Sequence, residues 1–293
     1  PAAVSSPIVA GDAVFFGGGN KNVYALDRHT GQELWRFETD HKHISPPAVA
    51  GGLLYFGTGG GYIYAVNRQT GQEVWKFETG DITSNRPAAA DGVVYVGTGR
   101  GTGATDTSYS GSAVKDAPNH HLYALDSQTG QELWRFRAGG RFATSPAVSG
   151  GIVYTGNDDG YLYANDAQTG HEQWRFETTG PVGSSPAVVD GAVYFGSEDK
   201  YLYALDSQTG QELWRFKTGG RVGGSSPTVA DGLVYVASLD GYLYALDSQT
   251  GEEVWKVETM IGESPTPVVV DGVVYFARLF DLYAVSGSGR PAP

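Results

Sequence analysis

Short runs of alternating apolar and polar residues recur along the chain, and turn-forming residues separate them. In the stretch 184–217, Asp190-Gly191 is a pair that favours a tight hairpin turn. Alternation rich in β-branched and aromatic residues favours strands. The stretch therefore predicts four short antiparallel strands joined by tight turns, at 187–189, 192–196, 201–205 and 211–216.

The same pattern repeats along almost the whole chain. The segment Leu202–Phe216 reads LYALDSQTGQELWRF, and close copies of it begin at Val23, Ile63, Leu122, Leu162, Leu202 and Leu243. Most copies lie roughly 40 residues apart, a spacing typical of propellers and solenoids. No stretch shows helical periodicity, which excludes a solenoid of helix pairs, and the hairpin turns disfavour a parallel β-helix. We therefore predict an all-β, seven-bladed β-propeller of four-stranded antiparallel blades.

The repeats divide the chain into one propeller domain over residues 1–293. Its blades are expected at about 5–38, 45–78, 85–137, 144–177, 184–217, 225–258 and 265–285, and a linker-like tail follows at 286–293. The seventh copy starts at Leu282 as LYAV and lacks the Thr-Gly turn and the tryptophan. We predict a three-stranded last blade with an exposed edge and a weak seam to the first blade. The alternative is that further sequence or a partner completes the blade.

A motif within each copy carries a family resemblance. The pattern Ala-x-Asp-x-x-Thr-Gly-x-x-x-Trp is present as Ala204, Asp206, Thr209, Gly210 and Trp214, and the second copy has asparagine in place of the aspartate. It resembles the tryptophan-docking repeat of pyrroloquinoline-quinone-type, quinoprotein-like propellers. Burial of a tryptophan removes roughly 150–250 Å² of its surface from water, which favours a structural role. We assign docking roles to Trp35, Trp75, Trp134, Trp174, Trp214 and Trp255.

The composition excludes several classes of function. The formal net charge is −12, whereas a nucleic-acid surface needs clustered lysine and arginine. No apolar run reaches 18 residues, so we expect no membrane insertion. No signal peptide is evident, and a chain that starts at Pro1 suggests a mature or excised product. The absence of cysteine excludes disulfides and thiol catalysis.

The largest break in the repeat is an insertion at 99–120 in the third blade, between its second and third strands. Loops at this place lie on the same face as the connections between blades. The resemblance also places ligand sites on that face. Glycine, serine and threonine dominate the insertion, and Tyr109 is its one aromatic residue. Either it is a tolerated, inert loop, or it is a lid or partner-contact loop.

A second break is Arg86, preceded by Asn85. The other blades have serine, threonine or proline directly before the proline that opens the first strand. In the family the first strand is innermost, so Arg86 is expected near the centre of the propeller. Its guanidinium could bind a carboxylate or phosphate in a bidentate manner. The alternative is an internal ion pair with Asp81 or Glu263.

Three further breaks supply weaker candidates for ligand binding. His41 and His43 occupy the first connection, and their spacing would point both side chains the same way on an extended segment. No third ligand with clear spacing follows, so we predict no metal site. Arg141 and Arg221 occupy corresponding connections and are either additions of positive charge to this face or ordinary surface arginines. Phe280 replaces a turn residue of the last blade.

The resemblance leaves three functional classes open: dehydrogenase, assembly scaffold and sensor domain. A quinoprotein dehydrogenase would need a tryptophan against its cofactor, but all six tryptophans occupy docking positions. We therefore predict a non-enzymatic protein without a cofactor. It is expected to bind a protein partner or a small molecule on the face bearing the 99–120 loop.

Two forms of binding module resemble this chain. One is the sensor domain of bacterial receptor-type serine/threonine kinases, which near-identical blades, a proline-rich end and a start that looks excised favour. The other is the lipoprotein scaffold of the outer-membrane β-barrel assembly machine. Both resemblances imply an extracytoplasmic or periplasmic location in a bacterium. A third possibility is a recently amplified propeller whose function is confined to the third blade and its neighbours.

Overall fold

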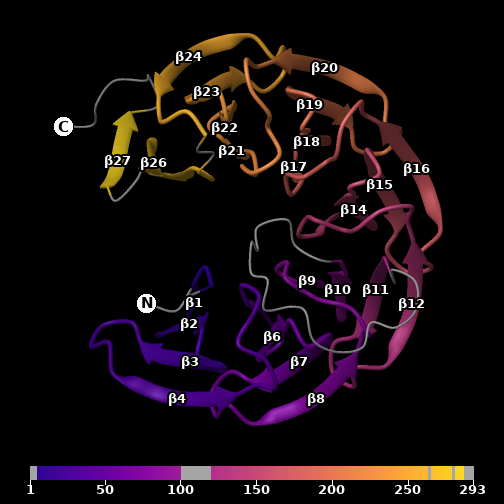
Figure 1. Ribbon diagram of the computed structural model, residues 1–293, viewed down its shortest axis with the longest axis vertical. Coiled ribbons are helices and arrows are strands. Elements are labelled where there is room, and N and C mark those ends of the chain that lie inside the picture. The colour runs from indigo at the N-terminus through magenta and orange to yellow at the C-terminus, as the bar shows by residue number, and fades with distance from the viewer. Residues whose placement is uncertain (1–4, 100–119, 263–264, 279–280, 287–293) are drawn as a thin grey trace. The chain divides into compact units, whose positions relative to one another are not determined.

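A computed structural model of the chain describes residues 5–99, 120–262, 265–278 and 281–286 (Figure 1). The regular elements in these ranges are all strands. The first three sheets are β1–β4 (Ile8–Ala10, Ala13–Gly17, Asn22–Asp27, Glu33–Glu38), β5–β8 (Ala48–Ala50, Leu53–Gly57, Tyr62–Asn67, Glu73–Glu78) and β9–β12 (Ala88–Ala90, Val93–Gly97, His121–Asp126, Glu132–Arg137).

The remaining sheets follow the same order along the chain. They are β13–β16 (Ala147–Ser149, Ile152–Gly156, Tyr161–Asp166, Glu172–Glu177), β17–β20 (Ala187–Val189, Ala192–Gly196, Tyr201–Asp206, Glu212–Lys217), β21–β24 (Thr228–Ala230, Leu233–Ser238, Tyr242–Asp247, Glu253–Glu258) and β25–β27 (Val268–Val270, Val273–Arg278, Asp281–Ser286).

Each sheet is an antiparallel meander in which sequence neighbours are spatial neighbours. Six sheets have four strands, and the seventh has three in the described part of the chain. The predicted seven-bladed, all-β propeller is therefore confirmed, as is its three-stranded last blade. Among the residues described there is no helix that could cross a membrane.

The strands group into two compact units. The first comprises Pro1–Gly151 with Asp166–His171, and the second comprises Ile152–Asn165 with Glu172–Pro293. Within each unit, the first strands of successive sheets lie next to one another, as β5 and β9 do in the first unit and β17 and β21 in the second. The first strand of each blade is thus its inner strand, and the fourth is its outer strand.

The middle strands of the second and fifth sheets are buried on both faces, because each of these sheets packs between two others. All five residues of β6 and of β18 are buried, and so are the middle residues of β7 and β19. One apolar cluster in the first unit joins the first two sheets through Phe15, Phe56 and Tyr64. Burial of such a side chain contributes roughly 1.5–3 kcal/mol, so the blade interfaces form the core.

A tryptophan on each of five outer strands packs against the next blade. The Trp174 indole donates from Nε1 to the Ser207 carbonyl at 3.2 Å, and the Tyr154 hydroxyl donates to the same carbonyl at 2.9 Å. The indole also covers Gly210, where a Cβ would lie 2.7 Å from the ring. The same indole bond and ring-to-glycine packing occur at Trp35, Trp75, Trp134 and Trp214. Trp255 packs on Tyr235, with ring centroids 5.8 Å apart.

The turn that receives the tryptophan is held by its own aspartate and threonine. Asp206 Oδ1 accepts hydrogen bonds from the backbone of Gln208 and Thr209 and from the Thr209 hydroxyl. Gly210 closes the turn with φ of 71°, a left-handed conformation that favours glycine. A bulge after Ala204 then pairs Leu205 with Glu212. The motif therefore shapes a turn whose glycine gives the next indole a flat surface.

We predict that Gly210→Ala is more destabilising than Gly191→Ala. Both glycines have positive φ, but only Gly210 faces an indole, and no atom lies within 4 Å of a Cβ at Gly191. The conformational cost alone is about 1 kcal/mol, and overpacking against Trp174 adds about 1–3 kcal/mol. Chemical denaturation measures both. Equal losses would contradict the proposed role of the indole contact.

A pH-dependent contribution to stability follows from the turn aspartates. In four of these turns the pKa of the aspartate lies below its ordinary value of 3.8, mainly because the threonine three residues later donates hydrogen bonds to the carboxylate. The four aspartates are Asp27, Asp126, Asp206 and Asp247. Because the folded pKa is lowered, this stabilisation is present above the unfolded pKa and is lost as pH falls through the folded value.

We therefore predict that the free energy of unfolding becomes less sensitive to acid when all four aspartates are replaced by asparagine. Asn67 occupies the equivalent turn of the second sheet, and its Oδ1 accepts from Gln69 and Thr70 at 2.9 and 3.0 Å, so asparagine preserves the geometry. The free energy of unfolding of the variant should fall less than that of the parent as pH drops below about 4. Urea titrations at several pH values measure this, and an equal fall in the free energy of unfolding of the variant and the parent would refute the prediction.

Candidate functional site

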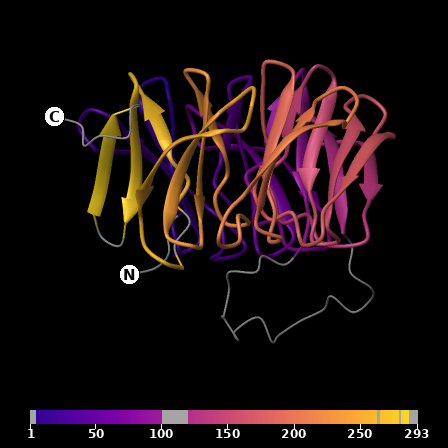
Figure 2. The same ribbon diagram turned by 90° about the horizontal axis from the view of Figure 1, so that it is seen from above.

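Within each unit, the connections between blades lie beside the turns that follow the second strands, on one face of the sheets. In the first unit, Gly59 donates to the His43 carbonyl at 2.9 Å, and Thr79 donates to Gly61 at 2.8 Å. In the second unit, Glu198 donates to Pro181 at 2.9 Å. Figure 2 shows the strands of each unit running between this face of the unit and the opposite one, which carries the remaining hairpin turns. The expectation that the loops between second and third strands share a face with the connections between blades is therefore correct.

Two hydroxyl groups precede the proline of most first strands, and the first of them closes its own blade. The Ser45 hydroxyl accepts from the Gly57 backbone at 2.9 Å. The Ser184 hydroxyl accepts from Gly196 at 2.6 Å. Each bond ties the start of an inner strand to the end of the second strand.

The second hydroxyl links a blade to the one before it. In the second unit, the Ser185 backbone donates to the Ser226 hydroxyl at 3.2 Å, and the Ser226 backbone donates to the Thr266 hydroxyl at 3.2 Å. We call this series of inner backbone-to-hydroxyl bonds the hydroxyl ladder. It satisfies polar groups at the innermost part of these junctions.

The third blade replaces both hydroxyls, with Asn85 and Arg86. The Asn85 amide donates from Nδ2 to the Phe142 carbonyl at 2.7 Å and so anchors the following connection. The Arg86 backbone still donates to Ser145 at 3.1 Å, which continues the ladder forward. The blade before it has Pro46 at this position, and proline has no N–H to donate. The second blade therefore has no backbone N–H at this position that needs a hydroxyl acceptor, and Arg86 in place of a hydroxyl residue breaks no hydrogen bond.

The Arg86 side chain is half-buried and lacks a counter-charge among the described residues. Its Nε is buried and has no hydrogen-bond partner there. Burial lowers the pKa of the guanidinium below its ordinary value, and no nearby carboxylate acts to raise it. Arg86 does not form the alternative ion pair with Asp81, and the other possible partner, Glu263, lies outside the described residues.

The start of the insertion lies beside the connection that leads to Arg86. Gly99 donates to the Ile82 carbonyl at 2.9 Å. A Cβ on Gly99 would lie 2.5 Å from that of Arg141, so Arg141 packs over this glycine. The structure thus brings together the segments that carry Arg86, Arg141 and the start of the insertion. Tyr109 lies outside the described residues.

His41 and His43 do face the same way, as their spacing predicts. Their rings are stacked with centroids 6.0 Å apart, and the His43 backbone donates to His41 Nδ1 at 3.1 Å. Burial and the nearby His43 charge lower the pKa of His41. One ring nitrogen of His41 is therefore engaged locally. Within the described ranges, no cluster of three or more His, Cys, Asp or Glu could hold a metal.

The remaining candidate residues have weaker support. Arg221, in the second unit, forms an ion pair with Glu198, with Nη1 3.2 Å from Oε2. It is therefore not an unpaired arginine. Phe280 lies outside the described residues.

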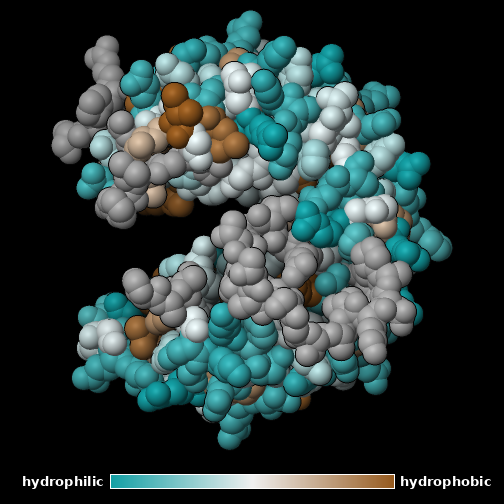
Figure 3. Space-filling view, in the orientation of Figure 1, coloured by the Kyte–Doolittle hydropathy of each residue, from teal (hydrophilic) through white to brown (hydrophobic). Residues whose placement is uncertain are grey.

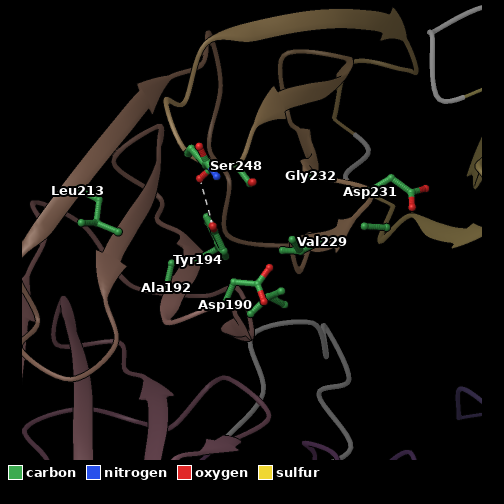
Figure 4. A pocket seen from close by; sticks show the side chains of 11 residues that line it. Asp190, Ala192, Tyr194, Leu213, Val229, Asp231, Gly232 and Ser248 are labelled. Carbon is green, nitrogen blue, oxygen red and sulfur yellow. Dashed lines mark hydrogen bonds between the residues drawn. The ribbon is translucent and has the colours of Figure 1, made fainter.

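A separate groove of about 420 Å³ lies in the second unit, between the fifth and sixth blades (Figure 4). Asp190, Val229 and Asp231 line it beside Tyr194, whose hydroxyl donates to the Ser248 carbonyl at 3.1 Å. These are ordinary repeat residues at a blade junction. The groove therefore arises from the repeat, whereas Arg86 departs from it.

Reasoning from sequence found Arg86 but missed the hydroxyl ladder. The signal was present, since two hydroxyl residues before proline recur as Ser5-Ser6, Thr144-Ser145, Ser184-Ser185 and Ser225-Ser226. Their partners were not evident, because they lie on a neighbouring strand or blade.

Comparison with known proteins supports the fold and the family. The family model described as outer membrane protein assembly factor BamB matches residues 2–118, 61–184, 118–224 and 182–290. The chain belongs to this family. The resemblance to pyrroloquinoline-quinone-type propellers is thereby confirmed. No curated protein matches the sequence.

Solved structures with the same fold include proteins of different function. BamB from Moraxella catarrhalis is 18% identical with a TM-score of 0.79, over 99% of this chain and 86% of that one. The quinohemoprotein alcohol dehydrogenase ADHIIG from Pseudomonas putida HK5 is 16% identical with a TM-score of 0.79, over 98% of this chain and 65% of that one. At these identities the likeness shows the fold alone.

We predict that Arg86→Met leaves the isolated protein as stable as the parent or stabilises it by about 1 kcal/mol. Methionine keeps an apolar stem but removes a partly buried charge that lacks a partner. Arg221→Met is the control, because it removes an exposed ion pair and should change stability by less than about 0.5 kcal/mol. A clear loss of stability in Arg86→Met during urea unfolding would show that the guanidinium has a stabilising partner within the chain.

Proposed function

We propose that this protein is a non-catalytic binding module that holds an acidic group of a protein partner at Arg86. The observation that carries the proposal is the half-buried guanidinium, whose Nε lacks a partner among the described residues. A partly dehydrated cation gains most from an anion, and the planar guanidinium matches a carboxylate or phosphate in a bidentate manner.

The charge of the whole chain favours a protein partner over a free polyanion. The net charge of −12 repels anions at long range. A single acidic group presented by a protein can overcome this repulsion through contacts elsewhere on the same face. Both ends of the 99–120 insertion lie on that face, which makes the loop a second candidate contact.

The catalytic alternative has weaker support. Five of the six tryptophan side chains donate to a carbonyl of the following blade and cover its turn glycine. These five indoles are therefore committed to packing. The similarity to a quinohemoprotein dehydrogenase extends over 65% of that chain and concerns the fold.

The family favours an assembly scaffold as the specific role. The BamB model matches along nearly the whole chain, and the BamB structure covers 99% of it. A scaffold of this type implies an extracytoplasmic or periplasmic location. The sensor domain of a receptor-type serine/threonine kinase is a second role in the same class, and the near-identity of the blades supports it.

Thermal unfolding with small anions tests the proposal. Citrate and phosphate serve as carboxylate and phosphate probes at constant ionic strength. A ligand at 100 times its dissociation constant stabilises the folded state by about 2.7 kcal/mol. We expect a dose-dependent rise of Tm in the parent and in Arg221→Met, and none in Arg86→Met.

A shift that persists in Arg86→Met, or no shift in any protein, would contradict an anion site at Arg86. A parallel titration with pyrroloquinoline quinone and calcium tests the catalytic alternative. Dye reduction with an alcohol substrate in that sample would contradict the non-catalytic assignment.

A further inference from the structure

The groove between the fifth and sixth sheets combines apolar walls with two carboxylates on its rim (Figure 4). Its volume of about 420 Å³ falls in the range of small-molecule sites, which are roughly 300–1,000 Å³ and mainly apolar. Figure 3 shows hydrophobic side chains gathered on the surface over the sixth and seventh sheets, but an apolar patch alone does not specify what binds. The groove is more specific, because apolar walls and charges come together in it.

The walls of the groove come from several elements of the second unit. Val189 of β17 and Val229 of β21 are half-buried against the apolar cluster of this junction. Ala192 and Tyr194 of β18 are buried, and Leu213 of β20 is exposed. Because β17 and β21 are inner strands and β20 is an outer strand, the groove is bounded at both its inner and its outer end. It therefore suits a compact ligand better than a long extended segment.

The charges on the rim are all negative. Asp190 and Asp231 are exposed and lie in the tight turns that follow β17 and β21. The eleven described residues that line the groove include no lysine or arginine. Burial raises the pKa of the Tyr194 hydroxyl, and the charges of Asp190 and Asp247 raise it further, so carboxylates act on the lining itself. A cation with an apolar stem matches both features of the groove.

The first sheet shows a turn of this kind for which the chain supplies its own cation. Asp12, in the turn after β1, has its Oδ1 3.7 Å from Nη2 of Arg28. The Arg28 backbone donates to the Asp12 carbonyl, and the Ser248 backbone donates to the Gly232 carbonyl in the same way. Arg28 and Ser248 therefore occupy equivalent positions. A serine at this position gives the rim carboxylates of the groove no counter-charge, so a cation from outside the chain can take that place.

The pair of aspartates distinguishes this junction from the four before it. The first residue of the equivalent turn in the first four sheets is Gly11, Gly51, Asp91 and Gly150. Two neighbouring sheets with aspartate therefore first occur at the fifth and sixth. Asp271 extends the series to the seventh sheet, but the counterparts of Ser248 and Gln249 there lie outside the described residues. The shape of the groove arises from the repeat, whereas its charge does not.

We propose that this groove binds a small aliphatic diamine. The hydrocarbon stem would lie against Val189 and Val229, and each ammonium group would meet one of the two rim aspartates. The net charge of −12 attracts cations to the protein at long range. Because exposed ion pairs are individually weak, we expect a dissociation constant of about 1 mM. The site belongs to the other unit and takes the opposite charge, so it is independent of the anion site proposed at Arg86.

Amide NMR spectra of the intact protein, titrated with 1,5-diaminopentane at constant ionic strength, both locate and measure binding. We expect saturable shifts at the amides of Gly191, Gly232 and Gln249, and none at Gly92 in the equivalent turn of the third sheet. Pentylamine has one ammonium group and should bind about three-fold more weakly. The uncharged 1-pentanol should cause no saturable shift.

Asparagine variants remove the charges and keep the turns. Asp190 and Asp231 have φ of 50° and 53°, a left-handed conformation that asparagine adopts readily. We expect Asp190→Asn and Asp231→Asn each to weaken binding about three-fold, and the double variant to lose the saturable shifts. Asp91→Asn is the matched control, because Asp91 has φ of 48° in the equivalent turn of another sheet, and it should bind as the parent does.

Three results would overturn the proposal. The first is no saturable shift in the parent at diamine concentrations far above the expected dissociation constant. The second is equal weakening in Asp91→Asn and in the double variant, which would reduce the effect to diffuse attraction by the negative charge of the whole protein. The third is tetralysine binding at the same amides about ten-fold more tightly than the diamine, which would identify a basic segment of a protein as the occupant.

Discussion

At each of five blade junctions, the packing depends on one backbone carbonyl that accepts a hydrogen bond from an indole of the preceding blade. At the Ser207 carbonyl, the indole of Trp174 and the hydroxyl of Tyr154 converge, and both come from the preceding blade. The indole then covers Gly210 of the same turn. The glycine leaves room for the ring, and the aspartate and threonine hold the turn that presents the carbonyl. A change in any of these residues affects the packing of two blades.

This constraint explains why the copies are so alike and why departures from them are informative. The junction residues of each blade must fit a surface that the next blade repeats. Arg86 and Asn85 lie outside that junction, at the inner end of the third blade, where other blades have hydroxyl residues. The substitution removes no bond from the preceding blade, because Pro46 has no donor. A charged group can therefore occupy this place without disrupting the fold.

Sequence alone was sufficient for the fold, because its signals are local and repeated. Alternating strands, the Asp-Gly turns and the spacing of the tryptophans predicted seven antiparallel blades, and the missing Thr-Gly turn predicted the short last blade. The bulge after Ala204 and the partners of Ser185 and Asn85 could not be predicted in this way. They depend on the register between strands and on contacts between blades, which the order of residues does not specify locally.

The candidate site was only partly predictable for the same reason. The comparison of repeats singled out Arg86, but whether it had a counter-charge depended on side chains brought near it by other segments. Arg221 shows the opposite outcome, since Glu198 from the preceding turn pairs with it. A crystal structure grown with selenate tests the central claim most directly. We predict an anomalous selenium peak beside Arg86, with a selenate oxygen within hydrogen-bonding distance of its Nε, and a carboxylate of the same chain bound at that nitrogen would contradict the claim.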